Sequence, residues 1–344
     1  MQKGLVSLLT PMYNMEKFVH RLLDSVLKQT YPYIEMVVID DGSTDQSSHV
    51  IDSYKPQFEA RGYSLKYVYQ ENGGQSVAIR NGLKLINGEY LAWPDADDFY
   101  AADDAIEQMV GVLQTSDESF QMVRTQGVIV EDGTLRQIGY IGQGADEEKF
   151  GNMFEDCLLV RNGFYFCSGA YLVKVKALHE TTGFDIYTSK DAGQNWQLLL
   201  PVLYKYRCQT IRRPLYNVVA HAQSHSRKYD SDYKGVLRQY SEYLSTQVGT
   251  LKRIKGLSDS CVKSYENMLK ADYNKKLLYE AIRENLRDIA NERFHLCQAH
   301  LDNTFERLGI ALLLKIKGGT YILNWSRYGI MGCKKYIHKV FKRK

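Results

Sequence analysis

The strongest constraint on the fold is an alternation of short apolar runs and amphipathic stretches in the first third of the chain. Four apolar runs have the length of strands: residues 5–10, 34–39, 65–69 and 90–93. Between the first two runs, Leu22, Leu23 and Val26 recur at three- and four-residue steps, which is typical of one face of a helix. Strands and helices alternating at this spacing predict an α/β fold with a doubly wound, mostly parallel sheet.

The remainder of the chain has a weaker pattern. Strand-like runs occur near residues 121–130 and 167–175, and a helical pattern covers residues 194–206. The sequence then becomes polar and helical up to about residue 315, without an internal repeat. We therefore expect three parts, which are an α/β domain (1–225), a helical C-terminal region (226–315) and a basic amphipathic tail (316–344).

An acidic cluster follows the fourth apolar run, with Asp95, Asp97 and Asp98 within four residues. Carboxylates this close repel one another, so they are tolerated when they are solvated or share a cation. Mg²⁺ and Mn²⁺ take oxygen ligands, commonly one or two carboxylates completed by phosphates and water. The cluster therefore indicates a metal that holds a nucleoside diphosphate, and the alternative is a solvated turn that caps the next helix.

Other strand ends carry residues suited to a nucleotide. Asp40 could accept a hydrogen bond from a base N–H or a ribose hydroxyl, and Tyr13 could stack on a nucleobase. Arg80, one turn into the helix after Gly73 and Gly74, could pair with phosphate oxygens. The alternatives are helix capping, simple packing and a structural ion pair. Because G-x-G-x-x-G and P-loop patterns are absent from the sequence, dinucleotide and P-loop binding are disfavoured.

These segments, in this order and approximate spacing, resemble the inverting family 2 glycosyltransferases with the GT-A fold. The resemblance is carried by residues 6–14, 23–31, 39–45, 78–82, 88–90 and 95–98. A looser resemblance to bacterial capsule and exopolysaccharide members lies in residues 193–201.

The resemblance implies a role for each matching residue. The nucleotide-sugar site would comprise Pro11, Tyr13, Asn14, Asp40, Asp41, Arg80 and Asp95. Within it, Asp40 would face the nucleobase, Arg80 the diphosphate and Asp95 the ribose. Asp97, helped by Asp98, would hold Mg²⁺ or Mn²⁺, which neutralises the charge that builds on a leaving diphosphate.

An inverting transfer also needs a general base for the acceptor hydroxyl. In the family this is the Asp of a Glu-Asp pair before an aromatic residue, but here the position contains Gln194-Asn195. Because an amide is not a base, we expect Asp191 to replace it, with Asp185 as the second choice and Asn195 orienting the acceptor. The catalytic residues are thus predicted to be Asp191 and Asn195.

Two basic segments complete the prediction. The loop with His221 and His225 resembles one that closes over the diphosphate, as a phosphate clamp or an extra metal ligand; the alternative is a solvated loop. After Glu306 the chain has no Asp or Glu, while Lys and Arg recur among apolar residues up to Lys344. This tail is predicted to bind an anionic membrane surface rather than nucleic acid, and packing on its own core is the alternative.

The predicted function is metal-dependent, inverting transfer of a sugar from a nucleotide-sugar donor, expected to be UDP-linked, to a lipid-linked or growing surface polysaccharide. Without an apolar run long enough to span a bilayer or an N-terminal signal pattern, we expect a cytoplasmic protein, peripheral on the inner face of the plasma membrane. The alternatives are an inactive sugar-nucleotide-binding subunit, which the Gln194-Asn195 pair favours, and a sugar nucleotidyltransferase.

Overall fold

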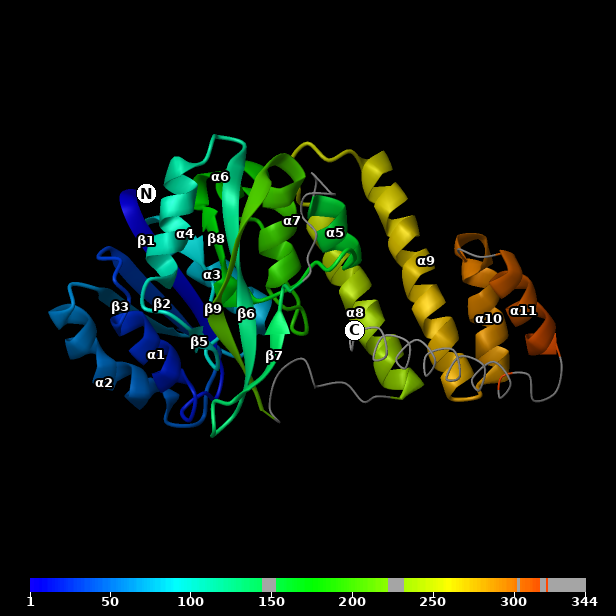
Figure 1. Cartoon of the computed structure of the whole chain (residues 1–344), viewed down its shortest axis with the longest axis horizontal. Coiled ribbons are helices and arrows are strands. Elements are labelled where there is room, and N and C mark those ends of the chain that lie inside the picture. Colours follow the sequence, from blue (N-terminus) through cyan, green and yellow to red (C-terminus); the bar gives the residue numbers. More distant parts are fainter. Residues whose placement is uncertain (144–152, 222–231, 302–303, 316–319, 321–344) are drawn as a thin grey trace, which may run out of the picture. The chain divides into compact units, whose positions relative to one another are not determined.

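The fold is built on one mixed sheet of nine strands, flanked by helices (Figure 1). The computed structural model describes residues 1–143, 153–221, 232–301, 304–315 and 320. The strands are β1 (Gln2–Met12), β2 (Ile34–Asp40), β3 (Ser64–Tyr69), β4 (Gly88–Ala92), β5 (Phe99–Tyr100), β6 (Phe120–Glu131), β7 (Gln137–Ile141), β8 (Tyr171–Lys174) and β9 (Arg207–Ala220).

The first seven helices are interspersed with the strands along the chain, and the C-terminal helices follow β9. The first seven are α1 (Val19–Leu27), α2 (Ser47–Ala60), α3 (Gln75–Gly82), α4 (Ala105–Thr115), α5 (Met153–Leu159), α6 (Val175–Thr182) and α7 (Asn195–Lys205). The C-terminal ones are α8 (Tyr233–Leu251), α9 (Asp259–Arg283), α10 (Arg287–Cys297) and α11 (Thr304–Lys315). Short 3-10 helices lie at Ser168–Ala170 and Gln298–His300.

The four apolar runs form the parallel part of the sheet. The strand order is β3-β2-β1-β4-β8-β6-β9-β5, with β7 paired to β6. Strands β3, β2, β1 and β4 run parallel to one another, whereas β8 runs antiparallel to both β4 and β6. The predicted α/β sheet is confirmed, and its second half is more mixed than the strand pattern indicated.

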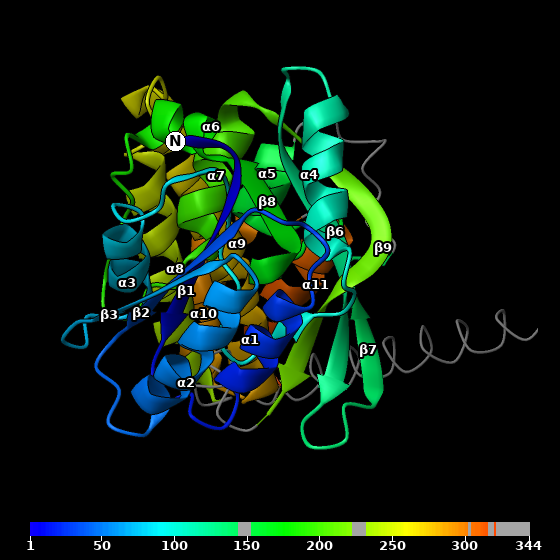
Figure 2. The same cartoon turned by 90° about the vertical axis from the view of Figure 1, so that its left-hand side faces the viewer.

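Alternating side chains of the parallel strands enter two different cores. Val6 and Leu8 of β1 pack with α1, α2 and α4 in one cluster. On the other face, α3 lies so close that a Cβ at Gly82 would be 2.2 Å from a methyl carbon of Leu9. Figure 2 shows α1 and α2, in blue, in front of β1 and β2. The sheet is therefore covered on both faces, as the continuous apolar runs require.

The chain divides into two compact units, which we describe separately. The first is Met1–Ser224 with Ser245–Asp259, and the second is His225–Leu244 with Ser260–Lys344. Residues 245–259, which the sequence placed in the C-terminal region, thus belong to the first unit. In the second unit, apolar side chains of α8, α9, α10 and α11 form their own core around Leu278. Among the described helices, none is long and apolar enough to cross a membrane.

Candidate active site

The register of the parallel strands brings three polar loops to one edge of the sheet. Met12 at the end of β1 pairs with Asp40 at the end of β2, and Leu8 pairs with Ala92 of β4. The segments that follow these strands therefore leave the sheet side by side. This carboxyl edge is where open α/β sheets bind ligands.

The loops after β1 and β2 hold each other through side chains. Asn14, whose φ is +53°, accepts a hydrogen bond from the Thr44 N–H at 2.8 Å. The Asp40 carboxylate accepts bonds from the Ser43 N–H at 2.8 Å and the Tyr67 hydroxyl at 2.7 Å. Burial, and then the bond to Asp40, raise the pKa of Tyr67. Tyr13, 47% exposed, presents its ring to solvent beside these loops, while Pro11 is buried in β1.

Asp41 fixes the loop that leads into α3. Its carboxylate accepts hydrogen bonds from the Gly73 N–H at 2.9 Å, the Gly74 N–H at 2.8 Å and the Gln70 amide at 2.7 Å. Gly74 has φ +92°, and a Cβ there would lie 2.2 Å from the carbonyl oxygen of Lys190. Asp41 therefore helps to shape the site, because it holds Gly74 in place and the missing side chain of Gly74 leaves room for the loop that contains Lys190.

That second loop, residues 188–193, is held against α3. The Ser76 hydroxyl donates to the Ser189 carbonyl at 2.9 Å and accepts from the Ser189 N–H at 3.1 Å. Further along α3, Arg80 Nη1 donates to the Thr188 hydroxyl at 3.2 Å, while its buried Nε has no partner among the described residues. A guanidinium with unused donor capacity at this edge suits an anionic ligand.

Asp95 lies where the loop after β4 meets α3 and α7. Its Oδ1 accepts hydrogen bonds from the Gln194 amide at 2.6 Å and the Gln75 amide at 3.1 Å. Burial, and then the charge of Asp97, raise the pKa of Asp95 to about 7, although the bonds from Ser168 and the two glutamines oppose this. Gln75 and Ser168 stand in no recognisable motif and are not among the predicted site residues.

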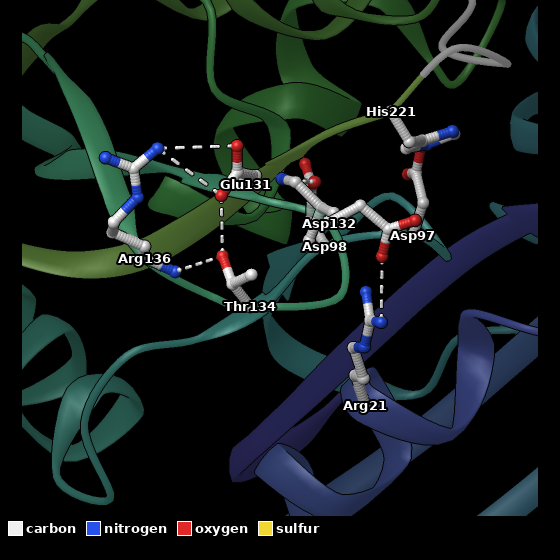
Figure 3. Close-up of polar contacts among 9 residues, drawn as sticks. Arg21, Asp97, Asp98, Glu131, Asp132, Thr134, Arg136 and His221 are labelled. Carbon is white, nitrogen blue, oxygen red and sulfur yellow. Dashed lines mark hydrogen bonds and ion pairs between the residues drawn. The ribbon is translucent and has the colours of Figure 1, made fainter.

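Asp97 and His221 are in contact in a group of residues that we call the acidic corner, which comprises Asp97, Asp98 and His221. His221 Nε2 lies 2.8 Å from Asp97 Oδ2, and the side chains are 3% and 19% exposed, respectively. Figure 3 shows both residues in the same corner as Asp98 and Asp132. Strand β9, the last strand along the chain, ends at Ala220. His221 follows directly, and its imidazole lies against the loop after β4.

Asp98 ties the same loop to β9. Its buried Oδ1 accepts a hydrogen bond from the Val219 N–H at 2.8 Å, two residues before His221. Burial, and then the charges of Asp97 and Asp95, raise the pKa of Asp98 well above its usual range. The predicted metal role of Asp98 stays a prediction.

The residues at this corner fit a divalent cation. No group of three or more His, Cys, Asp or Glu side chains in the described ranges is placed to hold a metal, and the two described side chains that meet here are Asp97 and His221. Their 2.8 Å separation is close to the roughly 3 Å between neighbouring ligands of an octahedral ion. A bound ion would keep positions for diphosphate oxygens and water.

At the start of α7 the chain carries the amides Gln194 and Asn195, where the family that the sequence resembles has a Glu-Asp pair. Asn195 Oδ1 accepts hydrogen bonds from the Trp93 indole at 3.1 Å and the Ser168 hydroxyl at 3.3 Å. Asp191 is exposed in the loop just before α7. Asp185, the second choice for the base, instead pairs with Arg253 at 3.5 Å.

The sequence model described as "Glycosyl transferase family 2" matches residues 7–182, just over half of the chain. The chain belongs to glycosyl transferase family 2. This confirms the family expected from the strand-end motifs.

Similar proteins from bacteria carry the same family name. This glycosyltransferase is 37% identical to the glycosyltransferase GlyA of Streptococcus pneumoniae over 98 residues, which are 28% of this chain and 14% of GlyA. It is also 37% identical to an uncharacterized glycosyltransferase of Rickettsia typhi over 113 residues, 33% of each protein. The aligned regions thus span a third or less of these relatives.

Solved structures share the GT-A fold over most of the glycosyltransferase. Residues 1–349 of Staphylococcus aureus TarS, in complex with UDP-GlcNAc, align with a TM-score of 0.57 and 18% identity, covering 95% of this chain and 92% of that chain. The mannosyltransferase PcManGT of Pyrobaculum calidifontis, in complex with GDP-Man and Mn²⁺, gives 0.54 and 16%, covering 98% and 88%. The predicted fold class is confirmed by these likenesses.

Two predictions for this glycosyltransferase fall outside the described residues. His225 lies in residues 222–231, and all of the basic tail except residue 320 lies in residues 316–344. His221, by contrast, is described, and its contact with Asp97 joins residues 124 positions apart.

Proposed function

We propose that this protein transfers a sugar, with inversion, from a UDP-linked donor to a growing or lipid-linked surface glycan, and that it uses a divalent metal. The observation that carries the proposal is the Asp97–His221 pair at the carboxyl edge of the parallel strands. The TarS complex with UDP-GlcNAc supports a UDP-linked donor, and the PcManGT complex with GDP-Man and Mn²⁺ supports a nucleotide-sugar donor held with a divalent metal. The surface-glycan acceptor rests on the sequence resemblance alone.

The donor would lie along the loops that end β1, β2 and β4. Tyr13 stacks on the base, Asp40 accepts a hydrogen bond from it, and Arg80 faces the diphosphate. Asp97 and His221 would hold the ion, which, when bound, acts as a Lewis acid on the diphosphate. Because an imidazole nitrogen suits transition metals better than Mg²⁺, this ligand pair favours Mn²⁺.

The reaction would need a base next to the acceptor hydroxyl, on the side of the anomeric carbon opposite the diphosphate. An acceptor hydroxyl oxygen attacks the anomeric carbon while the bond from that carbon to the diphosphate oxygen breaks, and the electron pair leaves with UDP. The hydroxyl proton passes to the Asp191 carboxylate. Asn195, oriented by Trp93, binds the acceptor. An α-linked donor would give a β linkage.

Release of UDP from a panel of UDP-sugars, with Mn²⁺ and mixed glycan acceptors, tests the proposal. Asp97→Asn and His221→Ala are expected to lower turnover at least about 100-fold, because stabilisation of the leaving group is lost. Asp117→Asn is the matched control. The Asp117 carboxylate accepts a hydrogen bond from the Ser119 N–H, just before the first residue of β6, whereas Asp132 of the site follows the last residue of that strand. Full turnover in Asp97→Asn would contradict the metal site.

The inactive-subunit alternative has one observation in its favour, the amides at Gln194 and Asn195. A thermal shift on adding UDP, without turnover on any acceptor, would support that alternative, because ligand binding to the native state raises its melting temperature. The family match argues against a nucleotidyltransferase.

We also propose that the protein works at the inner face of the plasma membrane, where the tail meets anionic lipid. This rests on the composition after Glu306, where basic and apolar residues alternate without any acidic residue.

A further inference from the structure

The imidazole of His221 packs face to face against an aromatic ring from another part of the fold. The Phe18 and His221 ring centroids are 4.4 Å apart, and the planes are inclined by 26°. Both residues are buried. Phe18 sits at the N-terminus of α1, where its N–H donates to the Met15 carbonyl at 2.9 Å. The ring that faces His221 is therefore fixed by the start of a helix.

The packing against Phe18 matters for the orientation of His221 because, among the described residues, it is the contact that faces the ring besides Asp97 at Nε2. Nε2 contacts Asp97, whereas the buried Nδ1 has no hydrogen-bond partner among the described residues. In most metal sites the other nitrogen of a ligating histidine is bonded to a carboxylate or carbonyl, which fixes the ring orientation. Here Asp98 fixes the backbone at Val219, but no described residue makes such a bond to the ring.

We propose that Phe18 is a positioning residue for the metal site, whose ring holds the His221 imidazole with Nε2 facing Asp97 before an ion binds. The proposal rests on the proposed function, since it assumes that Asp97 and His221 ligate the ion. Phe18 would act through its contact with His221 and not as a ligand of the ion.

A neighbouring ion pair is a weaker candidate for the same task. Arg21, whose guanidinium lies 5.8 Å from the Phe18 ring centroid, pairs with Asp132 at 2.9 Å (Figure 3). Their side chains are 20% and 37% exposed, and ion pairs with this exposure contribute little because water screens them. The stacked ring is buried and makes direct contact, so we assign the positioning to Phe18.

Binding of Mn²⁺ to the full chain in the presence of UDP tests this, measured by loss of the free Mn²⁺ signal in electron paramagnetic resonance. Phe18→Leu keeps the position apolar but removes the ring, and is expected to weaken Mn²⁺ binding about two- to tenfold. Phe18→Tyr keeps the ring and should retain the affinity. Arg21→Gln should change it less than about twofold.

The matched control is Phe58→Leu, a change of the same chemistry at a fully buried ring that packs edge-on against Tyr63. It should lower the melting temperature measured without metal but leave Mn²⁺ affinity unchanged. If Phe18→Leu does not fold, Phe18→Met is measured in its place.

Two outcomes separate this inference from the proposed function. Wild-type Mn²⁺ affinity in folded Phe18→Leu or Phe18→Met, with affinity lost in His221→Ala, would overturn the positioning role alone. Wild-type affinity in His221→Ala would overturn the metal site and the positioning role with it.

Discussion

Gly74 is the position where a single methyl group should disturb this site most. It joins the Asp41-bound loop to α3 with φ +92° and ψ 160°, a conformation open almost only to glycine. In Gly74→Ala the new Cβ would lie 2.2 Å from the Lys190 carbonyl oxygen and 2.8 Å from its carbonyl carbon. Because both are backbone atoms, the loop at residues 188–193 must move away by about 1 Å to restore normal contact.

The magnitude follows from two contributions. Backbone strain in this conformation costs about 1–3 kcal/mol. Movement of the loop breaks the pair of Ser76–Ser189 hydrogen bonds, each worth about 0.5–1.5 kcal/mol. We therefore expect Gly74→Ala to lower the free energy of unfolding by roughly 2–6 kcal/mol. Turnover should fall as well, since the displaced loop carries Asp191 and the Thr188 partner of Arg80.

Urea unfolding, with UDP release measured in parallel, checks both parts. The matched control is Gly62→Ala, because Gly62 also has a positive φ of +78° but nothing lies within 4 Å of its Cβ position. That variant should lose about 1–2 kcal/mol of stability and keep its turnover. Equal losses of stability and equal turnover in the two variants would refute the reasoning from the Lys190 contact.

Three further changes test other parts of the site. Asp191→Asn should lower kcat by about 10²- to 10⁴-fold while Asp185→Asn, whose partner is Arg253, keeps near-normal turnover; similar kcat in both would remove the base assignment. Because the pKa of Asp95 is raised to about 7, the stability that Asp95 contributes is complete below its unfolded pKa of about 4 and is lost as pH rises through about 7. In metal-free protein Asp95→Asn should therefore raise the melting temperature at about pH 8 and not at about pH 4, and a shift of the same size at both pH values would contradict this. Changing Lys334, Lys335, Lys339 and Lys342 to Gln should abolish flotation with anionic vesicles, because each lysine near the surface contributes about 1 kcal/mol to the free energy of membrane binding. Unchanged flotation would count against membrane binding.

The parallel half of the fold could be predicted from the sequence because its strands are continuous apolar runs and each ends in a polar cluster. Strands β5 and β7 could not be predicted from the sequence. β5 has two residues, and β7 is a short edge strand with exposed apolar side chains, so neither carries a recognisable period. Residues 167–175, expected to be one strand, contain a 3-10 helix before β8.

At the site, residue types could be predicted, but not which of them meet. The Asp95–Gln194 bond joins residues 99 positions apart, and the role of Asp41 depends on backbone N–H groups of a distant loop. Neither contact has a local sequence signal, because both arise from the order of strands in the sheet. Only Gln194 offered a hint, as an amide at a position where the family has a carboxylate.

That amide fits the charges around it. Gln194 donates to Asp95 at 2.6 Å; a glutamate there would set a second carboxylate against Asp95, and the two could not both be ionised. The neighbouring Asn195 in turn accepts from the Trp93 indole and is held in place. In these contacts Gln194 uses its amide N–H and Asn195 its amide oxygen, while the buried Gln194 Oε1 has no partner among the described residues. We therefore propose that, with amides at both positions, a carboxylate on the adjoining loop accepts the proton of the acceptor hydroxyl, and the comparison of Asp191→Asn with Asp185→Asn tests whether Asp191 is that carboxylate.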